Sequence, residues 1–142
     1  MIRLLIADDE KLEREALADM VSRRFEHEVV LELAENGRKA ADTAVLWGAD
    51  LILMDIEMPG MSGLDAARAV LAQRPACRVI FVTAYSLFQY AHEAVHLGAC
   101  DYLLKPVDPG SLHPAGHAAD RGGAEAGRTG PNDRAVPGAG NA

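Results

Sequence analysis

The sequence is short of cysteine, and the two that it has, Cys77 and Cys100, stand apart without a CxxC pair or any regular spacing. This pattern excludes a cysteine-based zinc site and a disulfide framework, and we expect both residues to be small buried hydrophobic side chains. The chain also lacks any apolar run of about 18 residues and an N-terminal apolar segment with a charged lead. We therefore expect no membrane span and a cytoplasmic location.

Positive charge is also scarce. The 142 residues include 14 Lys and Arg against 21 Asp and Glu, which gives a net charge of −7 with neutral histidine. Phosphate backbones of nucleic acids are bound by basic protein surfaces. The acidic balance therefore argues against direct DNA binding by this chain.

Short apolar runs rich in β-branched residues alternate with segments of helical periodicity. This alternation predicts an α/β fold, a doubly wound five-stranded parallel sheet with helices on both faces. Asn36, Ser62 and Ser86 are placed to begin helices, and Gly48 and Gly98 to end them. The predicted strands are residues 2–7, 28–34, 51–54, 78–84 and 100–104.

Charged and polar residues gather where the predicted strands end. Open parallel sheets bind ligands beyond the carboxyl ends of their strands, so we expect these side chains to meet at one site. One alternative is that Asp8 or Asp9 caps the helix that follows, where acidic residues are favoured. The residues at the strand ends are Asp8, Asp9, Asp55, Thr83 and Lys105.

This set of side chains predicts a phosphoryl transfer site. Mg²⁺ prefers oxygen ligands, and Asp9, Asp55 and a backbone carbonyl just after Asp55 would suit it. A carboxylate can act as a nucleophile toward phosphorus and form an acyl phosphate. The hydroxyl of Thr83 and the ammonium of Lys105 would then neutralise charge on the transferred group.

Four segments, LLIADDE, LILMDIEMPGMSGLD, VIFVTAY and GACDYLLKP, occur in this order along the chain. They resemble the signature segments of the receiver domains of bacterial two-component response regulators, which have a flavodoxin-like fold. The resemblance covers about residues 1–107. Within the family, TAYSLFQYAHEAVHLGACDYLLKPVD is most similar to receivers that precede AraC-type helix-turn-helix output domains.

The resemblance implies that Asp55 accepts a phosphoryl group from the phosphohistidine of a sensor histidine kinase. It also implies a Mg²⁺ pocket formed by Asp8, Asp9 and Asp55. The backbone carbonyl of Glu57 would complete the metal ligands.

Other residues would respond to the phosphoryl group. The resemblance implies that Thr83 and Lys105 contact the phosphoryl oxygens and that Tyr102 is a switch aromatic, which turns inward when Thr83 moves. The peptide bond before Pro106 is usually cis in this family, which an X-Pro bond permits. Receivers of this kind commonly form homodimers through the face of the fourth helix and fifth strand.

Two enzyme classes offer alternative interpretations. Residues 92–96, HEAVH, fit the H-E-x-x-H pattern of zinc proteases, but no third ligand is evident and we expect the histidines to face solvent. A phosphatase of the haloacid dehalogenase type would use Asp55 as nucleophile and Glu57 as acid. That family places its nucleophile on the first strand, whereas Asp8 and Asp9 come first here. We therefore expect that the chain is not an enzyme.

The last part of the chain differs from the rest in composition. Residues 109–142 include 8 Gly, 8 Ala and 4 Pro, and Pro114 and Gly116 would interrupt a fifth helix. We therefore predict a receiver domain over residues 1–107 and a low-complexity, disordered tail over residues 108–142. The chain would be a truncated transcriptional regulator, or a degenerate receiver fragment without signalling output.

Overall fold

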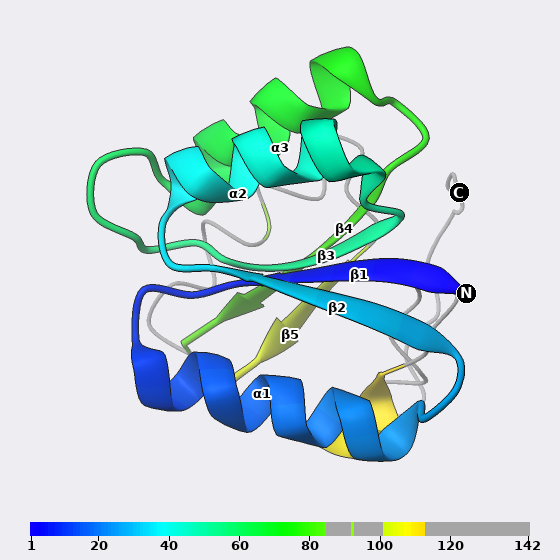
Figure 1. Ribbon diagram of the computed structural model, residues 1–142. Helices are drawn as coiled ribbons and strands as arrows, with labels where there is room; N and C mark the ends of the chain where they lie inside the picture. Colours follow the sequence, from blue (N-terminus) through cyan, green and yellow to red (C-terminus); the bar gives the residue numbers. More distant parts are fainter. Residues whose placement is uncertain (85–91, 93–100, 113–142) are drawn as a thin grey trace.

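The computed structural model describes residues 1–84, 92 and 101–112 (Figure 1). A parallel sheet of five strands lies at its centre, in the order β2-β1-β3-β4-β5. The predicted five-stranded parallel sheet is confirmed, and every strand end falls within one residue of its predicted position. The strands are β1 (Ile2–Ala7), β2 (Val29–Ala34), β3 (Leu51–Asp55), β4 (Arg78–Thr83) and β5 (Asp101–Leu104).

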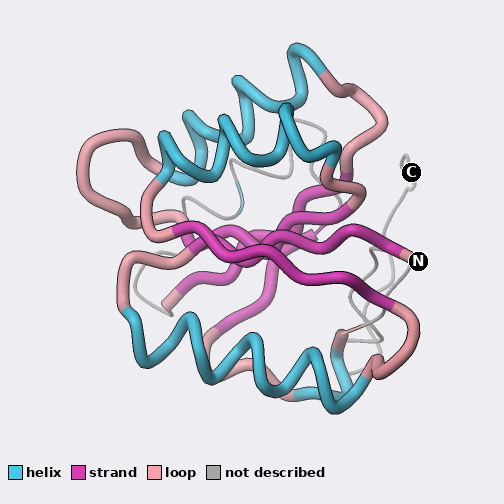
Figure 2. Tube along the Cα trace, in the orientation of Figure 1, coloured by secondary structure: helices cyan, strands magenta, loops and turns pink. Residues whose placement is uncertain are grey.

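Helices cover both faces of the sheet (Figure 2). Helix α1 (Lys11–Arg24) lies on one face, and α2 (Gly37–Thr43) and α3 (Gly63–Gln73) lie on the other. A short π-helix, η1 (Ala44–Gly48), continues α2, and a 3-10 helix, η3 (Pro109–Ser111), contacts α1. None of the helices in the described ranges has the length and apolar character needed to cross a membrane.

The central strands are buried on both sides, and this explains their continuous apolar sequence. Leu4 and Leu5 are neighbours on β1 and both are fully buried, but they belong to different cores. Leu5 packs in the core under α2 and α3, whereas Leu4 packs in the core under α1 with Val21 and Phe25. Successive side chains of a strand point to opposite faces, so one apolar run supplies both cores.

Two of the predicted helix caps are observed. The side chain of Asn36 accepts a hydrogen bond from the backbone N–H of Lys39 at 2.8 Å, and that of Ser62 accepts one from Asp65 at 3.1 Å. Gly48 ends η1 with a φ of +83°, a conformation that favours glycine. Ser86 and Gly98 lie outside the described residues.

The chain after β5 packs against α1. The 3-10 helix η3 is the helical element that the structure describes here, and Leu112, which follows it, is buried in the core under α1. The Nε of Arg24 donates a hydrogen bond to the carbonyl of Pro109 at 3.1 Å. Residues 113–142 lie outside the described part, and the division of the chain at residue 107 stays a prediction.

The first residue of α3 lies directly on the end of β3. A Cβ atom on Gly63 would be 2.0 Å from the backbone oxygen of Asp55, far inside any normal contact. The N–H of Gly63 also donates to the carbonyl of Ile56 at 2.8 Å. Glycine at this position therefore allows α3 to fix the backbone at the end of β3.

Replacing Gly63 with alanine is expected to destabilise the fold. The overlap with the backbone of Asp55 should lower the free energy of unfolding by about 1–3 kcal/mol, as other overpacked substitutions do. Alanine is otherwise favoured over glycine in helices by about 1 kcal/mol, so a net loss identifies the overlap as its cause. Urea denaturation measures this difference.

Gly110→Ala provides the matched control. A Cβ atom on Gly110 would meet the carboxylate of Asp108 at 3.7 Å, an ordinary contact, so its effect should stay within about 0.5 kcal/mol. If Gly63→Ala unfolds at the same urea concentration as Gly110→Ala, the close packing of α3 on β3 is not real.

Candidate functional site

Three aspartates meet at the carboxyl ends of β1 and β3. These strands pair in parallel, with Ala7 opposite Met54, so Asp8 and Asp9 leave the sheet beside Asp55. One carboxylate oxygen from each aspartate lies within 4.8 Å of the others. Asp8 and Asp55 are buried, whereas Asp9 is exposed. Three carboxylate oxygens at this spacing, one of them open to solvent, fit a hard divalent cation such as Mg²⁺.

The loop between β1 and α1 fixes Asp8. Its Oδ1 accepts a hydrogen bond from the N–H of Glu10 at 2.9 Å, and its backbone carbonyl accepts one from Nη1 of Arg14 at 2.7 Å. The N-cap position of α1 is Glu10, so neither Asp8 nor Asp9 holds the capping position considered as an alternative. The aspartates instead face the end of β3.

The ammonium of Lys105 lies among these carboxylates. Its Nζ is 3.4 Å from Oδ2 of Asp8 and 3.4 Å from Oδ2 of Asp55, and it also hydrogen-bonds the carboxylate of Glu13. The N–H of Lys105 donates to the carbonyl of Thr83 at 2.8 Å, which joins the ends of β4 and β5. The peptide bond between Lys105 and Pro106 is cis, as the resemblance implied.

Burial and charge change the proton affinities of this cluster. Burial raises the pKa of Asp55 to about 6, against the attraction of Lys105 and with the help of the charge on Asp8. Burial also raises the pKa of Asp8. Burial alone would lower the pKa of Lys105, but its hydrogen bond to Glu13 and the charges of Asp55 and Asp8 outweigh burial and raise it. The carboxylates outnumber the ammonium, and an additional cation would relieve their repulsion.

The remaining predicted residues lie around this cluster. Thr83 is the fully buried last residue of β4, and its hydroxyl donates to the carbonyl of Ala84 at 3.2 Å. Tyr102 lies on β5, partly buried against the core under α2 and α3. Glu57 lies two residues after Asp55 with an exposed side chain. The roles assigned to these three residues stay predictions.

The sequence did not indicate two residues that contact the cluster, Glu13 and Arg14. Both lie in the first turns of α1, where an acidic residue is already favoured by the helix dipole. Lys105 lies 92 positions from Glu13, so no local pattern joins them. The indication available in the sequence was that the helix carrying Glu13 begins directly beside Asp8 and Asp9.

The H-E-x-x-H match at residues 92–96 is described only in part. His92 has an exposed side chain, as expected for a residue that faces solvent. Glu93 and His96 lie outside the described residues, so the zinc protease interpretation is not tested there.

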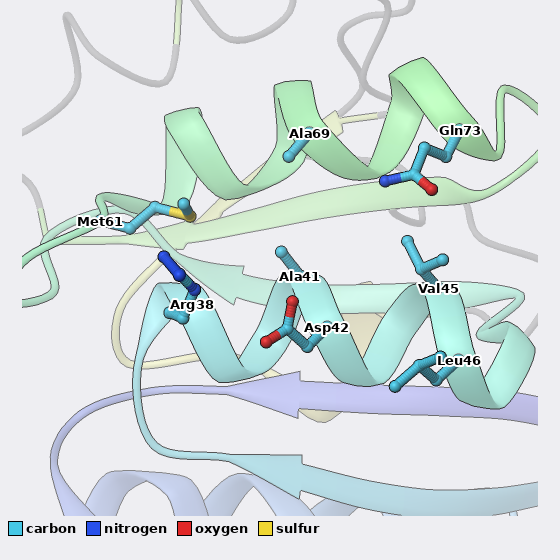
Figure 3. Close-up of a pocket in the computed structure, with 8 residues that line it drawn as sticks. All are labelled: Arg38, Ala41, Asp42, Val45, Leu46, Met61, Ala69 and Gln73. Atoms are coloured by element: carbon cyan, nitrogen blue, oxygen red, sulfur yellow. The ribbon is translucent and has the colours of Figure 1, made fainter.

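A separate cavity of about 390 Å³ lies between the helices on the opposite face from α1 (Figure 3). Figure 3 shows the side chains of Arg38 and Asp42 on α2, with Gln73 on α3 across the space. The cavity shares no side chain with the acidic cluster. Its lining consists of Arg38, Ala41, Asp42, Val45, Leu46, Met61, Ala69 and Gln73.

The known proteins to which this chain is similar include a transcriptional regulatory protein and a response regulator. The chain is 40% identical over 113 residues to the transcriptional regulatory protein PdtaR of Mycobacterium tuberculosis, an alignment that covers 80% of this chain and 54% of PdtaR. The solved receiver domain of AraT, a response regulator from Geobacillus stearothermophilus, is 39% identical with a TM-score of 0.68, covering 76% of this chain and 84% of that one.

The AraC-type resemblance is confirmed by a second solved structure. A two-component transcriptional regulator AraC from Clostridium phytofermentans is 33% identical with a TM-score of 0.68, covering 77% of this chain and 84% of that one. The chain spans about half the length of the curated relatives it matches, 54% of PdtaR for example. The model of the family described as "Response regulator receiver domain" matches residues 4–116, and the chain belongs to this family of two-component signalling proteins.

Proposed function

We propose that Asp55 is the phosphoacceptor of this receiver domain and that a sensor histidine kinase is the donor. One observation carries the proposal: oxygens of Asp8, Asp9 and Asp55 lie within 4.8 Å of one another, and the Lys105 ammonium is 3.4 Å from Asp55. A buried carboxylate beside a fixed cation is suited to attack an anionic phosphoryl group, because the cation reduces the charge repulsion.

In the proposed transfer, a carboxylate oxygen of Asp55 attacks the phosphorus of the kinase phosphohistidine. The new O–P bond forms as the P–N bond breaks, and its electron pair stays with the ring nitrogen. The ring leaves as neutral imidazole when its second nitrogen carries a proton. Lys105 and Thr83 would each contact a phosphoryl oxygen, since phosphoryl transfer depends on positioning and charge neutralisation.

Mg²⁺ is the proposed cofactor. Asp8, Asp9 and Asp55 would hold it together with the backbone carbonyl of Glu57. When bound, the ion would neutralise charge between the carboxylates and the phosphoryl group. Its entry is favoured by the excess of carboxylates over ammonium groups in this cluster.

The proposal extends to the output of the signal. Tyr102 and Thr83 would form the switch, and a homodimer would form through the face of β5 and the fourth helix, which the sequence predicts between Ser86 and Gly98. We further propose a cytoplasmic protein whose DNA-binding output is not part of residues 1–107. As a phosphoacceptor, the chain is modified once per signal and does not turn over a substrate.

Phosphorylation at Asp55 is the first test. Acetyl phosphate with Mg²⁺ is expected to add one acid-labile phosphoryl group to the chain, and Asp55→Asn should remove the signal because it removes the carboxylate proposed as the nucleophile. Intact-mass spectrometry measures the product. Asp19→Asn, which changes an exposed aspartate paired with Arg23, should label as the unaltered chain does.

Two outcomes would contradict this assignment. Full labelling of Asp55→Asn would place the phosphoryl group elsewhere. Sustained release of phosphate from phosphomonoesters that is lost in Asp55→Asn would instead favour the haloacid dehalogenase type of phosphatase.

The charge on Asp55 is also expected to reduce stability when no divalent cation is present. Its pKa is raised from 3.8 to about 6, so the folded chain binds more protons than the unfolded chain between these values, and stability falls as the pH rises through this range. Above about pH 6 the ionised Asp55 should lower the free energy of unfolding by about 1–3 kcal/mol. Asp55→Asn should therefore be more stable than the unaltered chain near pH 7.5.

Urea denaturation in EDTA measures this effect. The advantage of Asp55→Asn should shrink near pH 5, where Asp55 is partly protonated in the folded chain. Saturating Mg²⁺ should shrink it as well, because an ion that binds the folded chain stabilises it. An Asn variant that is no more stable than the unaltered chain near pH 7.5 in EDTA would contradict the expected cost.

A further inference from the structure

The Lys105 ammonium contacts one more carboxylate than the proposed chemistry requires. An ammonium has three N–H donors, and in this structure the acceptors are Asp8, Asp55 and Glu13. Asp8 and Asp55 belong to the proposed metal and phosphoacceptor site. Glu13 belongs to α1 and is the nearest of the three to the ammonium.

The position of Glu13 is fixed by the start of α1. The helix begins at Lys11, and Arg14, the next residue after Glu13, bonds the backbone carbonyl of Asp8 at 2.7 Å. Glu13 therefore approaches Lys105 from the α1 side of the cluster. Its side chain is 44% exposed, whereas that of Asp55 is 8% exposed, so Glu13 can be solvated when the ammonium leaves it.

The arrival of a phosphoryl group creates competition for the ammonium. A phosphoryl oxygen on Asp55 needs an N–H of Lys105, and charge-assisted hydrogen bonds to carboxylates are among the stronger ones in proteins. The bond to Glu13 is the one whose release leaves a carboxylate that water can reach. Exchange of Glu13 for the phosphoryl oxygen is therefore the least costly rearrangement at this site.

We propose that Glu13 is a positioning residue that holds the Lys105 ammonium toward α1 and competes with the phosphoryl group for it. The inference rests on the proposed function, since the competitor is the phosphoryl group on Asp55. Removal of the Glu13 charge frees the ammonium. Phosphoryl binding then becomes tighter and phosphorylation becomes faster.

The test uses the full chain and beryllofluoride, a tetrahedral mimic of a phosphoryl group, in saturating Mg²⁺. Fluorine NMR titration gives the affinity, and Glu13→Gln is expected to tighten it about three- to fivefold, as expected for loss of a partly exposed ion pair. Glu15→Gln is the matched control, because it removes an exposed acidic charge on the same helix, from a residue that pairs with Lys11. It should change the affinity less than about twofold.

A second measurement tells whether Glu13 acts through its contact with Lys105 or only through the negative charge that it adds to the site. The rate of labelling by acetyl phosphate is compared with and without Glu13→Gln in the unaltered chain and in Lys105→Met. Because Glu13 acts through Lys105, the substitution should speed labelling in the unaltered chain and leave the rate in Lys105→Met unchanged.

The outcomes separate this inference from the proposed function. Equal beryllofluoride affinities of Glu13→Gln and Glu15→Gln, or an equal gain in rate in both backgrounds, would overturn the role of Glu13 alone. Failure of the unaltered chain to bind beryllofluoride and to be labelled would overturn the proposed function, and with it the role of Glu13.

Discussion

The contact of one ammonium with carboxylates from three elements is the interaction on which the site depends. Lys105 follows β5, yet it reaches Asp8 after β1, Glu13 on α1 and Asp55 on β3. Two of these carboxylates are buried, and a buried charge without a partner is strongly destabilising. The strand order, which places β1 beside β3, brings the acids together, and the positive charge of Lys105 offsets part of their mutual repulsion.

Much of the fold follows from local sequence. The strands were predictable because apolar, β-branched runs are bounded by polar residues, and α2 and α3 because Asn36 and Ser62 precede periodic apolar positions. Asp8, Asp9 and Asp55 could be grouped because parallel strands end at one edge of a sheet. The rule that parallel strands end at one edge of a sheet thus predicted that Asp55 lies near Asp8 and Asp9, although no local sequence pattern joins them.

Other features depend on long-range contacts and were not predictable. The bond between Lys105 and Glu13 joins residues 92 positions apart, and the π-helix η1 is supported by Arg3, whose Nη1 donates to the carbonyl of Trp47 at 2.9 Å. The composition after residue 108 predicts poor helix formation, and within the described residues Pro109 begins a 3-10 turn that ends at Ser111. The burial of Leu112 depends on the surface of α1, which composition cannot describe.

The glycine at the start of α3 also affects how the sheet can move. The site of a Cβ on Gly63 is 2.0 Å from the Asp55 oxygen, and that on Gly37, at the start of α2, is 2.2 Å from the oxygen of Met61. These contacts leave less space than one methyl group between strand, loop and helices. Densely packed interiors transmit displacement instead of absorbing it. The end of β3 and the first turns of α2 and α3 are thus mechanically stiff, and any shift of the Asp55 backbone toward α3 must be carried by the helix as a whole.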